Sequence, residues 1–171
     1  MAVNTDVFTG SDGSITLAAV TGSGPAGTEG KAAGDLIKSF NTVNVGRVQN
    51  ITVQVTSEVR PYYEIGQRYA AELRPGNLSV KGTIGRAYVN GALLSLMLGD
   101  AAKQQQKGSW VQPSFNIAVQ VANPAVPSVQ SILTVHNVKF DTWSYNLPED
   151  DFLMESLTFQ ALFVTVEDKA K

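Results

Sequence analysis

The glycine-rich stretch VTGSGPAGTEGKAAGDL (residues 20–36) is the first place where the sequence could bind a ligand. Its Gly30-Lys31 pair is typical of phosphate-binding loops, which also need a glycine five residues earlier and a Ser or Thr after the lysine. This sequence has Pro25 and Ala32 at those two positions, so a backbone amide donor and the metal-binding hydroxyl are both missing. We therefore interpret Thr21–Gly34 as a flexible loop and not as a nucleotide site.

The other reactive side chains form no catalytic set. His136 is the only histidine, in the strand-like run LTVHNVKF, and we predict a core or boundary residue on the face of Ile132, Val138 and Phe140. The absence of cysteine excludes disulfides and thiolate sites. The acidic run Glu149-Asp150-Asp151 lacks the spaced ligands of a calcium loop and is interpreted as a solvated turn. We expect no enzyme, no cofactor, and no catalytic or metal-binding residues.

The composition is that of a globular chain. Its 171 residues are 43% hydrophobic and 16% charged, with a net charge of -2, so we expect one domain over residues 1–171 and no attraction for nucleic acid. The first residues lack a secretory signal pattern, and no apolar run is long enough to span a membrane. These features predict a soluble protein made in a reducing cytoplasm.

Alternation of apolar and polar residues predicts that most of the chain is β-structure. The runs ITVQVTSEV, GNLSVKGTIG and SFNIAVQVAN alternate with period two, and two later runs are apolar on both faces. Turn residues separate these runs, as at Pro75-Gly76-Asn77 and Leu147-Pro148. We therefore expect a mainly β fold, an antiparallel sandwich or barrel.

One segment has helical periodicity instead. Apolar residues in GRAYVNGALLSLMLGD recur at Val89, Ala92, Leu93, Leu96 and Met97, which predicts one flanking helix at about residues 85–99 with Gly99 as its C-cap. Asn90-Gly91 could alternatively form a hairpin turn between two short strands. The helix is favoured because five positions match its template.

Three long segments are expected to be irregular: Thr21 to about Asn41, Arg60–Gly76 and Ala101–Pro113. Loops of this length usually have a function or are disordered. The middle one, RPYYEIGQRYAAELRPG, interleaves tyrosines, arginines and glutamates, and Tyr and Arg are enriched at interaction hot spots.

The order of these pieces resembles the tail tube proteins of long-tailed bacteriophages, which are related to inner-tube proteins of contractile injection systems. The residues that carry the resemblance are VQNITVQVTSEVRPYYEIGQR, LSVKGTIGRAYVNGALLSLMLGD and VKFDTWSYNLPEDDFLMESLTFQALFVTVED, which cover most of the chain from Val48 to Asp168. The resemblance implies a structural subunit, six to a ring, with rings stacked into a conduit for DNA ejection. Its partners would be further copies, the tape-measure protein, baseplate or neck proteins, and a sheath if the tail contracts. Its location would be the virion tail, assembled in the host cytoplasm.

Under this resemblance, two sets of residues acquire roles. The long loop would reach a neighbouring subunit, and the polar face of a strand would line the lumen, although either hairpin could be the lining one. The candidate inter-subunit contacts are Tyr62, Tyr63, Glu64, Arg68, Tyr69 and Glu72, and the candidate lumen-facing residues are Thr52, Gln54, Thr56 and Glu58. Residues 21–34 would be a contact arm ordered only on stacking. The alternative function is a monomeric β-sandwich binding or adhesion module, such as a carbohydrate-binding domain, but the chain has only Trp110 and Trp143 to offer as aromatic platforms.

Overall fold

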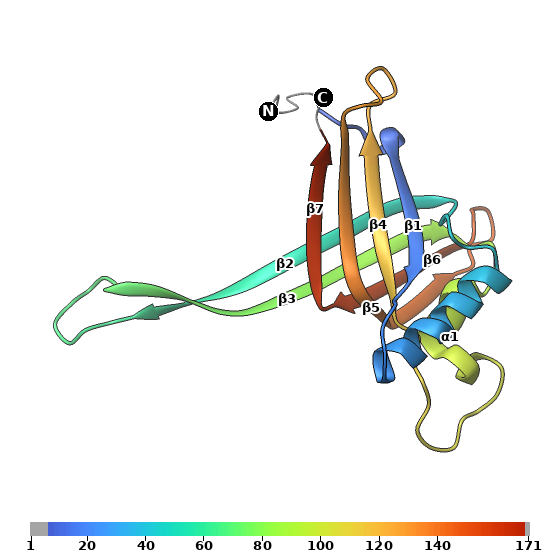
Figure 1. The fold of residues 1–171 in the computed structure, drawn as a ribbon, viewed down its shortest axis with the longest axis horizontal. Coiled ribbons are helices and arrows are strands. Elements are labelled where there is room, and N and C mark those ends of the chain that lie inside the picture. Colours follow the sequence, from blue (N-terminus) through green and yellow to red (C-terminus); the bar gives the residue numbers. More distant parts are fainter. Residues whose placement is uncertain (1–6, 170–171) are drawn as a thin grey trace.

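The computed structural model describes residues 7–169 and contains seven strands and two α-helices in that part of the chain. All strand pairs are antiparallel, and the strands form one curled sheet (Figure 1). This confirms the mainly β, antiparallel fold. The strands are β1 (Gly13–Ala19), β2 (Val48–Tyr62), β3 (Glu72–Ala87), β4 (Phe115–Ala122), β5 (Gln130–Asn146), β6 (Met154–Ala161) and β7 (Phe163–Lys169); the helices are α1 (Pro25–Ser39) and α2 (Ala92–Leu98).

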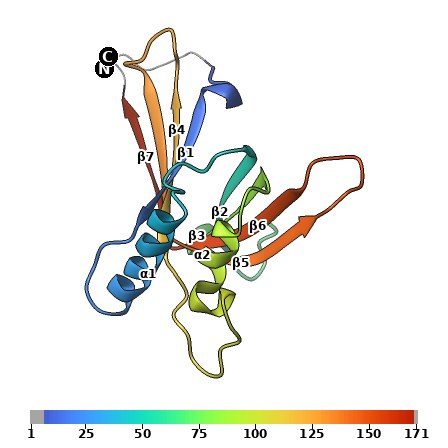
Figure 2. The same ribbon diagram turned by 90° about the vertical axis from the view of Figure 1, so that its right-hand side faces the viewer.

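The long strand β5 divides the sheet into two layers. Its first half pairs with β4 and β7, and β4 pairs with β1, which makes the first layer. Its second half pairs with β6, which is followed by β3 and β2, and this makes the second layer. A bulge at His136–Asn137, where Asn137 has a φ of 54°, lies near the change of layer (Figure 2). Bulges bend a strand in this way because one extra residue breaks the ladder.

The core lies between the layers and under the helices. Leu17, Ile117 and Val135 of the first layer are buried, as are Ile84 and Phe159 of the second. The helices add Ala33, Ile37, Leu93 and Leu96 to the same cluster.

Helix α1 corrects the prediction of a flexible loop between Thr21 and about Asn41. Pro25 stands in the first turn, where its missing amide costs nothing, and the buried face follows helical spacing at Gly30, Ala33 and Ile37. A Cβ on Gly30 would lie 2.0 Å from the carbonyl oxygen of Val20, so the glycine lets the helix approach the end of β1 closely. The three glycines of the helix with close neighbours, Gly27, Gly30 and Gly34, are therefore packing residues and not signs of flexibility.

Helix α2 confirms the one helix that the sequence predicted, at about residues 85–99, but is shorter than predicted. It covers Ala92–Leu98, while residues 85–87 end β3 and Val89 is exposed outside the helix. Asn90-Gly91 forms no hairpin turn; the Asn90 side chain accepts a hydrogen bond from the Ala92 amide at the helix start. Gly99 is the C-cap with a φ of 58°, as predicted, and residues 103–114 are irregular.

The segment Arg60–Gly76 is strand at both ends, which corrects the prediction that it is irregular throughout and leaves a shorter loop. Strand β2 continues to Tyr62 and β3 begins at Glu72, so only residues 63–71 connect them. The result is a long hairpin that projects far from the two layers (Figure 1).

Among the described residues, no helix is long and apolar enough to cross a membrane.

Candidate assembly surface

Within residues 7–169, no other strand pairs with the projecting half of the β2–β3 hairpin. Strand β6 pairs with β3 only over Val80–Ala87, so residues 56–79 continue as a two-stranded ribbon, which we call the arm (Figure 1). A lone two-stranded ribbon is at best marginally stable in water. The arm therefore has the form of an element that is completed by a partner.

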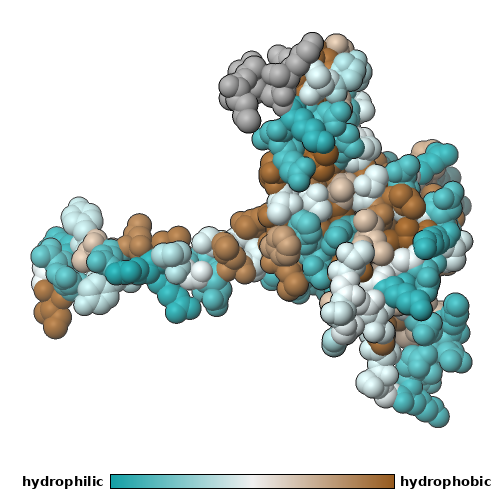
Figure 3. Space-filling view, in the orientation of Figure 1, coloured by the Kyte–Doolittle hydropathy of each residue, from teal (hydrophilic) through white to brown (hydrophobic). Residues whose placement is uncertain are grey.

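One face of the arm is apolar and uncovered. Cross-strand pairs place Leu78 beside Ser57, Pro75 beside Val59, and Leu73 beside Pro61 on the face that continues from the buried Val80. Leu78 is 71% exposed and Leu73 is 67% exposed, because neither layer reaches this far. Space-filling colours show apolar groups along the arm (Figure 3). We call the set Val59, Pro61, Leu73, Pro75 and Leu78 the apolar stripe.

The end of the arm carries the predicted contact residues, and the structure brings them together. Tyr62 ends β2, Glu72 begins β3 opposite it, and the connection between them holds Tyr63, Glu64, Arg68 and Tyr69. All six are exposed, Tyr69 to 88%. Glu72 binds Arg74 at 2.7 Å in an exposed ion pair, which contributes little stability. Their role as contacts stays a prediction.

The opposite face of the second layer is polar. The candidate lumen residues Thr52, Gln54, Thr56 and Glu58 all lie exposed on this face of β2. Thr52 is the first member of a row that crosses all four strands through direct cross-strand partners. This threonine row consists of Thr52, Thr83, Thr158 and Thr142.

A second polar row lies beside the threonine row. It runs from Gln54 through Lys81 and Gln160 to Lys139, so two lysines bring positive charge to a face of amides and hydroxyls, and Lys139 is paired with Glu29 of α1 at 2.9 Å. Asp141 adds a negative charge and accepts hydrogen bonds from the Thr158 hydroxyl and, at 3.0 Å, from the Gln160 amide. Partial burial acts to raise the pKa of Asp141, but these hydrogen bonds outweigh it and lower the pKa below the ordinary value. The face is thus polar and nearly balanced in charge.

Both edges of this layer are open. Among residues 7–169, β2 pairs only with β3 in the ladders, and residues 140–146 of β5 pair only with β6. Unpaired edges are templates for strand addition by another chain. A four-stranded layer with two open edges and a polar outer face is suited to joining copies of itself side by side.

Solved structures of tail and injection-system components share this fold. The chain is similar to one from an extracellular contractile injection system, the PVC sheath–tube complex, with a TM-score of 0.63 and 11% identity over 95% of this chain and 92% of that one. A chain of the anti-feeding prophage baseplate, solved with sixfold symmetry, is similar with a TM-score of 0.59 and 11% identity over 98% of this chain and 97% of that one. The SPP1 tail tube is similar with a TM-score of 0.54 and 12% identity over 96% of this chain and 81% of that one. The chain has the tail-tube fold. No protein-family model and no curated protein matches it by sequence.

His136, which the sequence analysis considered as a reactive side chain, lies away from the arm and from the polar face. His136 is half-buried on the outer face of the first layer, where its ring stacks on Phe163 at 4.3 Å and bonds the Thr165 hydroxyl at 2.9 Å. The bulge turns Val138 and Phe140 into the core, so the prediction that they share a face with His136 is wrong.

The acidic turn and the two tryptophans, which were considered as a metal site and as aromatic platforms, lie in different parts of the molecule. Glu149-Asp150-Asp151 lies exposed in the turn between β5 and β6. Trp143 points into the core, where its indole NH donates to Glu155 at 2.9 Å, so it offers no aromatic platform for a sugar. Trp110 is partly exposed in the 103–114 segment.

Sequence reasoning missed two features of the tail-tube fold. The apolar stripe was hidden because a bulge at Gly76–Asn77 shifts the register of β3, and alternation alone does not reveal it. The second is a buried ion pair between Arg86 and Glu155, which are direct partners on β3 and β6. Their opposite charges in two neighbouring strand-like runs were the available signal.

Proposed function

We propose that this chain is a structural, non-catalytic subunit of a tail tube, in which six copies close into a ring and rings stack into a hollow conduit. The observation that carries this proposal is the second layer, which has two open edges and a polar face crossed by the threonine row. The sixfold symmetry of the anti-feeding prophage baseplate, whose chain shares this fold, supports the number six.

Ring closure would join the open edge of β2 to residues 140–146 of β5 in the next copy. Each copy carries one edge of each kind, so repetition of the same contact can close a ring without leaving an edge exposed. Closure removes strand edges that would otherwise aggregate, and it places every polar face on the same side.

The polar face would line the lumen. The threonine row, with Gln54, Thr56 and Glu58, presents hydroxyl, amide and acidic groups, and the cations beside it are Lys81 and Lys139, of which Lys139 is paired with Glu29. DNA affinity grows with the number of phosphates that lysines and arginines neutralise, so a face poor in cations lets DNA slide without being held. The lumen would carry the genome during ejection and the tape-measure protein during assembly.

The ends and the outside of the tube would meet other proteins. The arm, with Tyr62, Tyr63, Arg68 and Tyr69 at its end, would contact an adjacent subunit or ring. Baseplate and neck proteins would bind the terminal rings, and a sheath would surround the tube if the tail contracts; the fold's occurrence in a sheath–tube complex supports the latter. Assembly would take place in the host cytoplasm, and the mature subunit would belong to the virion tail.

The test is the state of association of the purified chain. Sedimentation velocity across a range of concentrations should show species six times the mass of the 18.3 kDa chain and larger, and negative-stain images should show rings or tubes with a central hole. A chain that remains strictly monomeric at high concentration would refute the proposal and favour a monomeric binding module.

A further inference from the structure

The two layers of the sandwich extend past one another in different directions. In the first layer, Leu17, Ile117, Val135 and Val164 form a cross-strand row that is covered by the second layer. Two residues further along each strand lies a parallel row that faces the same way and is less covered. We call it the apolar row: Ile15, Val119, Leu133 and Val166.

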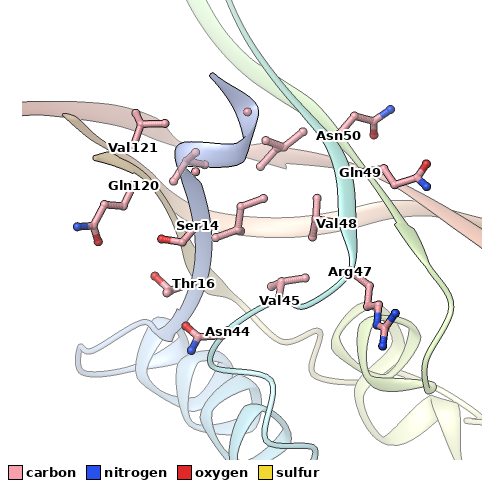
Figure 4. Close-up of a pocket in the computed structure, with 15 residues that line it drawn as sticks. Ser14, Thr16, Asn44, Val45, Arg47, Val48, Gln49, Asn50, Gln120 and Val121 are labelled. Atoms are coloured by element: carbon pink, nitrogen blue, oxygen red, sulfur yellow. The ribbon is translucent and has the colours of Figure 1, made fainter. Parts of the chain in front are cut away.

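Two members of the apolar row, Ile15 and Val119, line one side of an open groove with a volume of about 830 Å³. Val45, which precedes β2, and Val48 at its start lie on the facing side (Figure 4), and polar residues such as Arg47 also line the groove. At one end of the row, Val166 is 59% exposed although its side chain points to the core side of β7. An exposed apolar patch with a polar rim, here Asn44, Arg47 and Gln120, is typical of a surface that another protein covers.

The second layer also has an exposed apolar surface that the first layer does not cover, namely the apolar stripe of the arm. It too continues a core face beyond the point where the other layer ends, and its five residues are all uncharged. The residues of the apolar row are likewise uncharged; the nearest charges are Arg47, which lines the facing side of the groove, and Asp168, two residues beyond Val166. Neither surface would therefore leave an unpaired charge if the two were pressed together.

We propose that the apolar stripe on the arm of one copy packs on the apolar row of a second copy, so that each copy completes the sandwich of its neighbour. This inference rests on the proposed function, because it needs copies arranged in an array. The contact is between two different surfaces, and such a contact propagates from copy to copy into rings or filaments.

The arm has enough surface for a stable contact. Val59, Leu73 and Leu78 are each more than half exposed, and Tyr63 and Tyr69 lie in the connection just beyond them, whereas Tyr62 is on the opposite face of the ribbon. Aromatic side chains bury about 150–250 Å² each, so the stripe and tyrosines together reach the order of 800 Å² that one partner contributes to a standard interface.

The experiment uses the absence of cysteine, which makes every introduced thiol unique. Val59→Cys chains are mixed with tagged Val166→Cys chains, assembled, and oxidised mildly; the expected product is a disulfide-linked heterodimer, which can only form between copies. The matched controls are Glu58→Cys and Thr165→Cys, the neighbouring positions on the opposite faces of the same strands. Each control should give at least tenfold less heterodimer.

The outcomes separate this inference from the proposed function. If rings or tubes form but the V59C and V166C chains do not cross-link above the controls, the docking is wrong and the tube proposal stands. If the V166C thiol is protected from maleimide in tubes yet forms no link to V59C, another segment covers the row and the inference is equally overturned. If wild-type protein stays monomeric, both proposals fail.

A charged substitution gives a second, independent readout. Val166→Asp places a carboxylate in the apolar row at a position exposed enough to leave the monomer folded. We expect an unchanged thermal unfolding midpoint and at least a tenfold rise in the concentration needed for assembly. Normal assembly of V166D would contradict the proposed packing.

Discussion

The β2–β3 hairpin has two parts: the root, where β3 also pairs with β6 over Val80–Ala87, and the arm, where it does not. The same two strands are packed in the root and exposed in the arm. In the root, β3 is sandwiched between β2 and β6, and Val80 and Ile84 are buried. In the arm, the same apolar face continues through Leu78 and Leu73, which are mostly exposed. Period-two alternation identifies the apolar face in the root, whereas the bulge at Gly76–Asn77 shifts its phase in the arm, and in neither part does it show what covers that face.

The difference teaches that stability and assembly are separated along one hairpin. The root holds the buried Arg86–Glu155 pair and close-packed glycines, whereas the arm holds exposed ion pairs and aromatics. Changes in the root should therefore unfold the subunit, and changes in the arm should leave it folded but unable to associate. The following predictions test that separation.

The largest effect is expected from Glu155→Ala in the root. Removing the carboxylate leaves the Arg86 guanidinium buried without its partner and removes the acceptor for the Trp143 indole, which should cost about 3–5 kcal/mol of unfolding free energy. The matched arm variant, Glu72→Ala, removes an exposed partner and should cost less than about 1 kcal/mol. Urea unfolding measures both, and equal losses would contradict the separation.

A slightly smaller loss is expected from Gly82→Ala in the root. The added Cβ would lie 2.2 Å from the Thr52 carbonyl oxygen and 2.3 Å from the Phe159 ring, so the ladder or the core must shift, at a cost of about 1–3 kcal/mol. Ser79→Ala, three positions away on the exposed arm, should change stability by no more than about 0.5 kcal/mol. Thermal unfolding of the two variants gives the comparison.

Replacing Tyr62 and Tyr63 together by alanine should affect association and not folding. Exposed tyrosines at an interface contribute about 1 kcal/mol or more each, so the concentration needed for assembly should rise about tenfold or more. The urea midpoint should stay at the wild-type value. Lys31→Ala, an exposed change on α1, serves as a control for nonspecific effects. Normal polymerisation of the double variant would show that these tyrosines are not contacts.

The smallest effect concerns Asp141 on the polar face. Its pKa is lowered in the folded state by hydrogen bonds from Thr158 and Gln160, against the opposing effect of partial burial. The ionised carboxylate therefore stabilises the fold above its ordinary pKa, and that contribution is lost as the pH falls through the lowered value. Asp141→Asn should be less stable than wild type at pH 7, and the difference should shrink below about pH 4. A difference that does not depend on pH would contradict this assignment.

The sequence predicted the strands well because one face of each is buried. Period-two alternation in β2, β3 and β4 follows directly from a covered face and a wet face. Helix α1 was missed because its composition suggests flexibility, although Gly30, Ala33 and Ile37 have helical spacing after Pro25. The reason for Gly30 in this helix is its close approach to Val20 at the end of β1. This is a tertiary contact, so the local sequence pattern does not reveal it.

The candidate assembly surface was predictable only in part. Interleaved tyrosines and arginines indicated the end of the arm, and the polar face of β2 could be read from Thr52, Gln54 and Thr56. The threonine row and the apolar row depend on the register between strands distant in sequence, such as Thr83 with Thr158. Register is fixed by bulges and by the packing of the whole sheet, so no single run of residues reveals it.

The most direct test of the central claim is a cryo-electron microscopy map of the assembled protein at side-chain resolution. We predict rings of six copies in which β2 of one copy pairs with residues 140–146 of the next, and in which Thr52, Thr83, Thr142 and Thr158 face a central channel. A map in which the threonine row faces outward, or in which the edges of the second layer stay unpaired, would contradict the account.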